Sequence, residues 1–311
     1  MHKIGKGEVW ALVAAAAYSM DSLFTATAVK GVGINYLFGA SLRTIPLLLF
    51  TCFYLLLAKK KEETSIFSDI KLVLALVAYG ALTFFLGNSM FFSALQKGGV
   101  LITTPLTGTQ VLWAAGFAIL LLGEKLNWKM VAGMLVSISG ISLLAVGKTG
   151  LSTLATDWWL AIPLALATAI CWSLSGVLIA YVQRKGVNRF HALLFAILVG
   201  NLCIHSFLLL SGQSAIYLTT PISAIANVII AGLFGMLALI GLTTALGLTS
   251  VASASTIASL QVGLAPLLAW PILHEQLNMF MASGIMLILL GVIIVQLYRF
   301  SPLIEKKQIG S

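Results

Sequence analysis

The sequence predicts an all-α integral membrane protein, built from ten transmembrane helices in two inverted five-helix repeats around a central cavity. Three observations carry this prediction. Of the 311 residues, 60% are hydrophobic and only 9% are charged, whereas a soluble globular protein carries about 25% charged residues. Apolar stretches of about 20 residues, long enough to cross a bilayer as helices, follow one another along the chain. A motif near the end of the first half recurs near the end of the second.

The apolar stretches are joined by connections too short to hold a soluble domain. We therefore expect a multi-pass protein of the cell membrane with the lipid bilayer as its solvent. The ten predicted spans cover residues 8–29, 35–57, 71–95, 100–122, 128–147, 157–182, 190–211, 222–247, 251–273 and 279–298.

The recurring motif divides the chain into a first repeat, residues 1–150, and a second repeat with a short cytoplasmic tail, residues 151–311. Its two copies align without a gap, and the matched pairs are Glu124 with Glu275, Asn127 with Asn278, and Gly140 with Gly291. Because five spans are an odd number, the second repeat must enter the membrane from the opposite side. The expected architecture is an inverted repeat with a substrate site near the midplane.

The net charge of +9 reflects the excess of lysine and arginine in cytoplasmic loops rather than a nucleic-acid partner. If the N-terminus is cytoplasmic, the outer segments hold only Lys30, Lys97 and Lys148, and Arg43 lies inside a span. The other fourteen of the 18 basic residues then face the cytoplasm. This bias predicts that both termini are cytoplasmic.

These features together resemble the EamA-type drug/metabolite transporter superfamily. The resemblance rests on the five-plus-five repeat, the doubled Glu-x-Leu motif, and Arg43 early in the second span. It also rests on an aromatic and a small residue at matching places, Tyr18-Ser19 and Trp172-Ser173. The resemblance implies a monomer whose cavity is lined by spans one to four and six to nine, with spans five and ten outside. Members of this superfamily export amino acids or import and exchange other small metabolites.

Asp21 and Arg43 are the charged residues that lie at depth in the predicted spans, where a charge costs roughly 2.5–3.5 kcal/mol on insertion scales. Counted along their helices, they lie at similar depths. They could form a buried bridge between the first two spans. Alternatively, Asp21 could bind a substrate ammonium group or a proton, and Arg43 a carboxylate.

Polar and aromatic residues near the middle of spans complete the candidate substrate site. Amides inside the bilayer need partners, which can be neighbouring helices or a substrate. Aromatic rings around Asp21 could cage an ammonium group by cation–π attraction, or could simply pack between helices. These candidates are the amides Asn88, Gln110 and Gln261 and the rings of Tyr18, Trp113 and Trp172.

Two prolines in the ninth span, Pro266 and Pro271, are expected to kink that helix and make its outer half a gate. The motif carboxylates Glu124 and Glu275 lie at turns, so we interpret them as structural. Each could bond the backbone amides that start the next helix, with Asn127 or Asn278 as the N-cap.

The expected function is secondary transport of small metabolites by alternating access, with export of amino acids or similar zwitterions favoured. The alternative substrate is an organic cation such as a quaternary amine. An intramembrane enzyme is a distant alternative, because the sequence shows no nucleophile–base pair or metal cluster. It also shows no nucleotide-binding motif, which argues against direct coupling to ATP. No cofactor or metal is expected; the partners are a small-molecule substrate and, as a candidate coupling ion, the proton.

Overall fold

The fold follows from the solvent: inside a bilayer, a backbone amide can be satisfied only within the protein, so each apolar stretch becomes a helix. A computed structural model describes residues 5–57, 65–110, 112–113, 116–117, 128–149, 157–248 and 257–308. Helices joined by turns make up these ranges, and no strand occurs within them.

Seventeen elements are described, and several of them join end to end. In the first repeat they are α1 (Lys6–Ala26), the π-helix η1 (Thr27–Gly31), α2 (Tyr36–Leu42), α3 (Ile45–Leu57), η2 (Ile66–Ser68), α4 (Ile70–Gly80), the π-helix η3 (Ala81–Gly87), α5 (Asn88–Gly98), α6 (Val100–Gly108) and α8 (Trp128–Thr149). In the second repeat they are η4 (Trp158–Leu160), α9 (Ala161–Arg184), α10 (Arg189–Leu210), α11 (Ile216–Thr219), α12 (Ile222–Leu248), α14 (Gln261–Ile272) and α15 (Met279–Gln308).

Six of the described helical stretches are long and apolar enough to cross a membrane, and three shorter apolar helices accompany them. The six are Lys6–Gly31, Tyr36–Leu57, Ile70–Gly98, Trp158–Gln183, Arg189–Leu210 and Ile222–Leu242. The predicted spans 100–122 and 251–273 lie partly outside the described residues. The expected multi-pass helical fold is therefore confirmed, and the count of ten stays a prediction.

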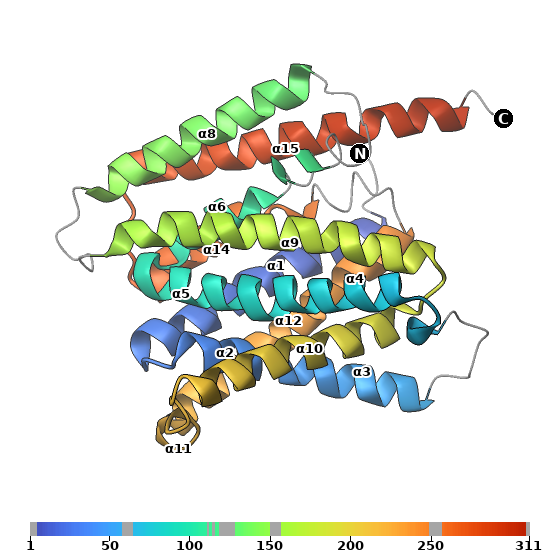
Figure 1. Ribbon diagram of the computed structural model, residues 1–311. Helices are drawn as coiled ribbons and strands as arrows, with labels where there is room; N and C mark the ends of the chain where they lie inside the picture. The colour runs from blue at the N-terminus through green and yellow to red at the C-terminus, as the bar shows by residue number, and fades with distance from the viewer. Residues whose placement is uncertain are drawn as a thin grey trace.

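Helices α8 and α15, the last of each repeat, run side by side along one flank of the bundle (Figure 1). They meet through glycines: Gly140 of α8 lies against the backbone of Gly284, and Gly291 of α15 lies against the backbone of Gly133. In the repeat, Gly140 is equivalent to Gly291 and Gly133 to Gly284. The two contacts are therefore related to each other as a twofold axis between the helices requires. Midway between them, the Ser137 hydroxyl lies 3.5 Å from the carbonyl oxygen of its own equivalent, Ile288.

The remaining long helices pack as pairs that join one repeat to the other. Helix α1 packs along α12, and the rings of Phe24 and Phe234 stack there with centroids 5.6 Å apart. The corresponding pair in the other half is α5 with α9. Near this second pair, Gly87 leaves room for the indole of Trp172. The two repeats are thus interlocked around a common centre.

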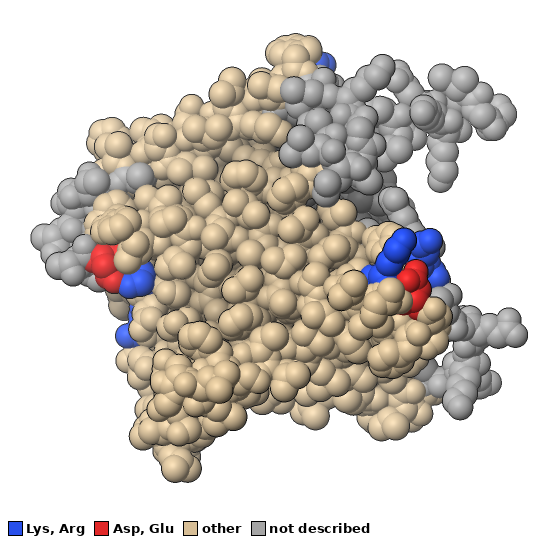
Figure 2. Space-filling model, viewed as in Figure 1, with Lys and Arg blue, Asp and Glu red and all other residues tan. Residues whose placement is uncertain are grey.

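Charged side chains in the view of Figure 2 lie toward opposite ends of the molecule, and a broad uncharged band separates them. Large apolar side chains are exposed on α3, α10 and α15, among them Leu49, Phe53, Leu202 and Leu290. An apolar band with charged ends is the surface that a membrane-spanning bundle presents to lipid.

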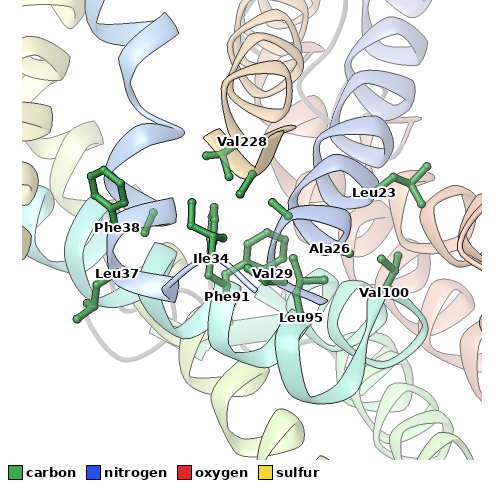
Figure 3. Close-up of a cluster of buried hydrophobic side chains, with 14 of the residues drawn as sticks. Leu23, Ala26, Val29, Ile34, Leu37, Phe38, Phe91, Leu95, Val100 and Val228 are labelled. Carbon is green, nitrogen blue, oxygen red and sulfur yellow. The ribbon is translucent and has the colours of Figure 1, made fainter. Parts of the chain in front are cut away.

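One end of the bundle, where α1 ends and α6 begins, is filled by a large cluster of buried hydrophobic side chains (Figure 3). We call it the end cluster. Both repeats contribute to it; its members include Leu23, Val29, Ile34, Phe38, Phe91, Phe92, Leu95, Val100, Ile204, Val228 and Ala265. At the other end, where α4 begins and α9 ends, lies a second cluster that includes Leu72, Leu76, Val182, Val187 and Ala192, and a small one of Ala11, Ala245 and Ile257 accompanies it.

Candidate functional site

A partly open cavity of about 630 Å³ lies between the two repeats. Helices α1, α3, α4, α5 and α6 with η3 line it from the first repeat, and α9, α10, α12 and α14 line it from the second. No described residue of α8 or α15 belongs to its wall. This arrangement agrees with the expectation that the last helix of each repeat packs outside the cavity.

Asp21 and Arg43 meet on the cavity wall. Arg43 Nε donates to Asp21 Oδ1 at 2.9 Å, and the second guanidinium nitrogen, Nη2, donates to the other carboxylate oxygen. Thr25 Oγ1 adds a longer bond of 3.4 Å to Oδ1. The Asp21 side chain is 2% exposed and that of Arg43 13%. The geometry is a forked carboxylate–guanidinium pair, in which each charge neutralises the other.

The third guanidinium nitrogen of Arg43 is held by Asn88, one of the predicted amides, through a 3.2 Å bond from Nη1 to Oδ1. One helical turn further, the ring of Phe91 lies 5.6 Å from the Arg43 guanidinium carbon. Phe91 was not among the predicted site residues. Its spacing of three residues from Asn88 placed it on the same helix face and could have identified it.

Four other predicted residues also reach the cavity. Tyr18 and Trp172, which occupy equivalent places in the two repeats, both line it, as do Gln110 and Gln261. The ring of Trp172 packs against Phe91 with centroids 5.3 Å apart. The cavity therefore offers amide, hydroxyl and aromatic surface around one neutralised ion pair.

Trp113 differs from this group, because it does not line the cavity and its surface is 38% exposed. The expectation that Trp113 shares the cavity face of Gln110 is not met. Helix α6 ends at Gly108, just before Gln110, and the Thr109 carbonyl accepts the amides of Leu112 and Trp113 in a tightened turn. An aromatic cage around an ammonium group would have to form without this ring.

The two prolines of α14 lie within a helix that continues from Gln261 to Ile272. Pro266 is buried beside the end cluster, and Pro271 is exposed. Neither ends the helix, although each proline lacks the N–H that would donate a backbone hydrogen bond within it. The gating role of these residues stays a prediction.

The second copy of the sequence motif is described, whereas Glu124 and Asn127 of the first copy lie outside the described residues. Asn278 accepts the amide of Met281 at 2.9 Å and so caps α15 as expected. Its side-chain nitrogen also donates to the carbonyl of Gly147 at 2.6 Å. Asn278 therefore ties the start of α15 to α8.

Glu275 departs from the expectation that it bonds the amides starting the next helix. It accepts instead from the amides of Val100 and Leu101, each at 2.9 Å, which start α6 in the other repeat. The physical reason is that Asn278 already caps α15, while the N-cap of α6 is Gly99 and has no side chain to offer. The Glu275 carboxylate therefore accepts from the first amides of α6, which have no side-chain acceptor from their own N-cap.

A further polar group joins α2 to α10 beside the cavity. Ser41 Oγ donates to Asn201 Oδ1 at 2.5 Å and contacts His205 Nε2 at 2.9 Å. Asn201 then donates to Thr44, a residue of the cavity wall, at 2.9 Å. The remaining ring nitrogen of His205 lies 2.7 Å from the Tyr217 hydroxyl. This group ties the two repeats together through side chains rather than backbone.

Comparison with known proteins decides the family. The sequence model of the EamA-like transporter family matches residues 5–146 and, separately, residues 159–297. The chain belongs to the EamA-like transporter family. The two matches correspond to the two repeats, and membership indicates a membrane transporter of small molecules rather than an enzyme. No curated protein matches the sequence.

The EamA fold is also found among solved structures, of which 28 chains match. A protein described only as "Crystal structure of protein" is similar over 95% of this chain and 100% of its own, with a TM-score of 0.56 and 18% sequence identity. At this identity the likeness speaks for the fold alone.

Proposed function

We propose that this EamA-family protein is a secondary transporter that moves amino acids or similar zwitterions across the cytoplasmic membrane by alternating access, most simply as an exporter. The observation that carries the proposal is the Asp21–Arg43 pair on the wall of a cavity between the two repeats. A midplane site between repeats is where such carriers hold their substrate.

The paired charges favour a zwitterion over a cation. A zwitterion brings one positive and one negative group, so it can exchange partners with Asp21 and Arg43 without leaving a net charge in the bilayer. A cation that captured Asp21 would leave the Arg43 guanidinium, only 13% exposed, with Asn88 as its polar partner. The organic-cation alternative is supported by the rings of Tyr18, Trp172 and Phe91 in the wall.

The orientation belongs to the same proposal. With both termini cytoplasmic, as the lysine and arginine distribution suggests, the end cluster closes the outer side. The cavity residues Leu47, Ile179 and Leu242 then lie toward the cytoplasm. The working unit is proposed to be a monomer, because the internal repeat supplies the symmetry.

Counterflow in liposomes tests the function. Purified protein is reconstituted with one unlabelled amino acid inside, and uptake of the same labelled amino acid is followed, with choline as the cationic counterpart. We expect saturable counterflow for members of the amino-acid set and little for choline. Counterflow of choline alone would favour the cation alternative, and an imposed pH gradient in the same vesicles tests proton coupling.

Gly235 gives a sharper test of where the substrate docks. A β-carbon there would lie 3.3 Å from Asp21 Oδ2 and 3.6 Å from Arg43 Nη2, so the missing side chain leaves the ion pair open to the cavity. We expect Gly235→Ala to lower zwitterion counterflow about tenfold, the effect of losing roughly 1.4 kcal/mol of binding.

The matched control is Gly176→Ala, which adds the same methyl group elsewhere on the cavity wall. A β-carbon at Gly176 meets nothing within 4 Å, so its counterflow should stay near that of the wild type. Equal activity of the two variants would show that substrate does not approach the ion pair from the α12 side.

A further inference from the structure

The carboxylate of Glu275 connects the two repeats at the end of the bundle that the end cluster fills. It lies in the turn between α14 and α15 and accepts the amides of Val100 and Leu101 at 2.9 Å each. Lys30 Nζ, in η1 of the first repeat, lies 3.6 Å from its Oε1. The Glu275 side chain is only 8% exposed. All three partner groups belong to the opposite repeat.

The start of α6 is shaped to receive this carboxylate. Its N-cap, Gly99, has φ +75°, a conformation that favours glycine. A β-carbon there would overlap the Glu275 carboxylate and lie 2.6 Å from Lys30 Nζ. The first amides of a helix have no partners within it, and the helix dipole favours a negative charge beside them. The cap that α6 cannot supply therefore comes from the second repeat.

The same contact adjoins the end cluster directly. Val100 donates its amide to Glu275 and places its fully buried side chain among the cluster residues (Figure 3). On the other side of the contact, His274 has φ 51°, which is rare for a residue with a β-carbon. The turn thus has an unfavourable backbone conformation at the residue directly before Glu275.

We propose that Glu275 is a releasable latch: its bonds to the start of α6 and to Lys30 hold this end of the bundle shut, and they break each time the cavity opens there. The proposal rests on the alternating-access function proposed above and adds the residue that regulates which end is open. In the proposed orientation, the engaged latch marks the state that is closed to the outside.

A hydrogen-bonded carboxylate is well suited to repeated release. When the end opens, water can hydrate the carboxylate, the two amides and the Lys30 ammonium group, so each lost bond is replaced by a bond to solvent. The free-energy difference between the closed and open states of this end is then small enough for substrate binding to shift the equilibrium. The apolar end cluster alone would oppose exposure to water, but apolar burial is non-directional and does not specify which residues separate when this end opens.

Cysteine labelling measures this opening without requiring transport. In a variant whose cysteines, Cys52, Cys171 and Cys203, are replaced by serine, Val228→Cys places a thiol in the end cluster, where Val228 is fully buried. A hydrophilic maleimide is then added to the detergent-solubilised protein. We expect Glu275→Gln to accelerate labelling about ten- to a hundredfold, since hydrogen bonds to a charged group are lost.

Two controls separate a latch from general damage. Val292→Cys in α15 places the same thiol in a separate buried cluster that also includes Leu144 of α8, and its labelling should not change with Glu275→Gln. Asp157→Asn removes an ion pair with Lys97 at the same end, where the Asp157 side chain is 44% exposed, and should leave Val228→Cys labelling unchanged.

A milder variant covers the case in which Glu275→Gln does not fold. Lys30→Gln leaves both amide bonds of Glu275 in place, so we expect a smaller, severalfold acceleration at Val228→Cys. Combined with Glu275→Gln, it should add nothing further, because the two residues share one contact.

The outcomes distinguish the latch from the function on which it rests. Unchanged labelling at Val228→Cys in both variants, or equal acceleration at Val292→Cys, overturns the latch even if counterflow is normal. Absence of counterflow by the wild type with amino acids and choline overturns the proposed function, whatever the labelling shows. Accelerated labelling confined to Val228→Cys, with slowed counterflow, supports both.

Discussion

Asp21→Asn is expected to abolish transport and to lower the free energy of unfolding by about 3–5 kcal/mol, the cost of removing one partner of a buried ion pair. Asp21 is 1% exposed and takes two of the bonds that Arg43 donates. An asparagine would leave the guanidinium charge without a counterion. Thermal unfolding of the purified variant measures the stability, and counterflow measures the transport.

The double variant Asp21→Asn with Arg43→Gln separates the structural role of the pair from its role in transport. Removing both charges should restore much of the lost stability, because no unpaired charge remains buried. Transport of a zwitterion should stay absent. If the double variant recovers stability and transport together, the pair is only a structural bridge between the first two spans.

Two further variants complete this comparison. Thr25→Val removes only the 3.4 Å bond to Asp21 and should cost about 1 kcal/mol or less. Arg43→Gln alone should abolish transport of a zwitterion in protein that remains folded, whereas under the organic-cation alternative transport of the cation should survive. Unchanged zwitterion counterflow in a folded Arg43→Gln protein would contradict the assignment of Arg43 to the carboxylate.

Much of the fold could be predicted because the membrane leaves few alternatives. Helices must satisfy their own amides in lipid, so apolar length alone marked the long helices Lys6–Gly31 and Arg189–Leu210. Counting residues along two helices sufficed to bring Asp21 and Arg43 to one depth, and the structure joins them. Depth along a helix is a local property, which a sequence carries.

Rotation about the helix axis and the choice of a distant partner are not local, and there the predictions failed. Trp113 was expected on the cavity face, but the tightened turn after Gly108 changes the helical register. The nearest helix start was assumed for Glu275, although α6 of the other repeat was the one without a cap. Gly235 could not be identified from the sequence, because it comes close to the Asp21–Arg43 pair only through the packing of α12 against α1.

The second large effect is expected at the crossing of α8 and α15, where Gly284→Leu should destabilise the protein by about 3 kcal/mol or more. Even a β-carbon at Gly284 would lie 2.7 Å from the Gly140 carbonyl oxygen and 2.7 Å from the Leu144 amide nitrogen. Both are backbone atoms, which cannot move aside by changing a rotamer. The two helices would have to separate.

Symmetry makes this prediction testable from the other repeat. A β-carbon at Gly140 would lie 2.6 Å from the Gly284 carbonyl oxygen, so Gly140→Ala and Gly284→Ala obstruct the same approach. We expect each alone to lower the thermal unfolding temperature, and the double variant to lower it by clearly less than the sum, since helices already separated accommodate a second methyl group. Strict additivity would show that the two glycines do not share one contact.

The control is Ser139→Leu, which adds bulk to an exposed position of α8 beside Gly140 and should leave the unfolding temperature nearly unchanged. Because no described residue of α8 or α15 lines the cavity, the folded fraction of Gly284→Ala should retain counterflow per molecule. This is the opposite of the Asp21→Asn result, in which folded protein should be inactive. If Gly284→Ala protein that remains folded loses counterflow, the outer helix pair takes part in opening the cavity, and its twofold crossing is then part of the transport mechanism.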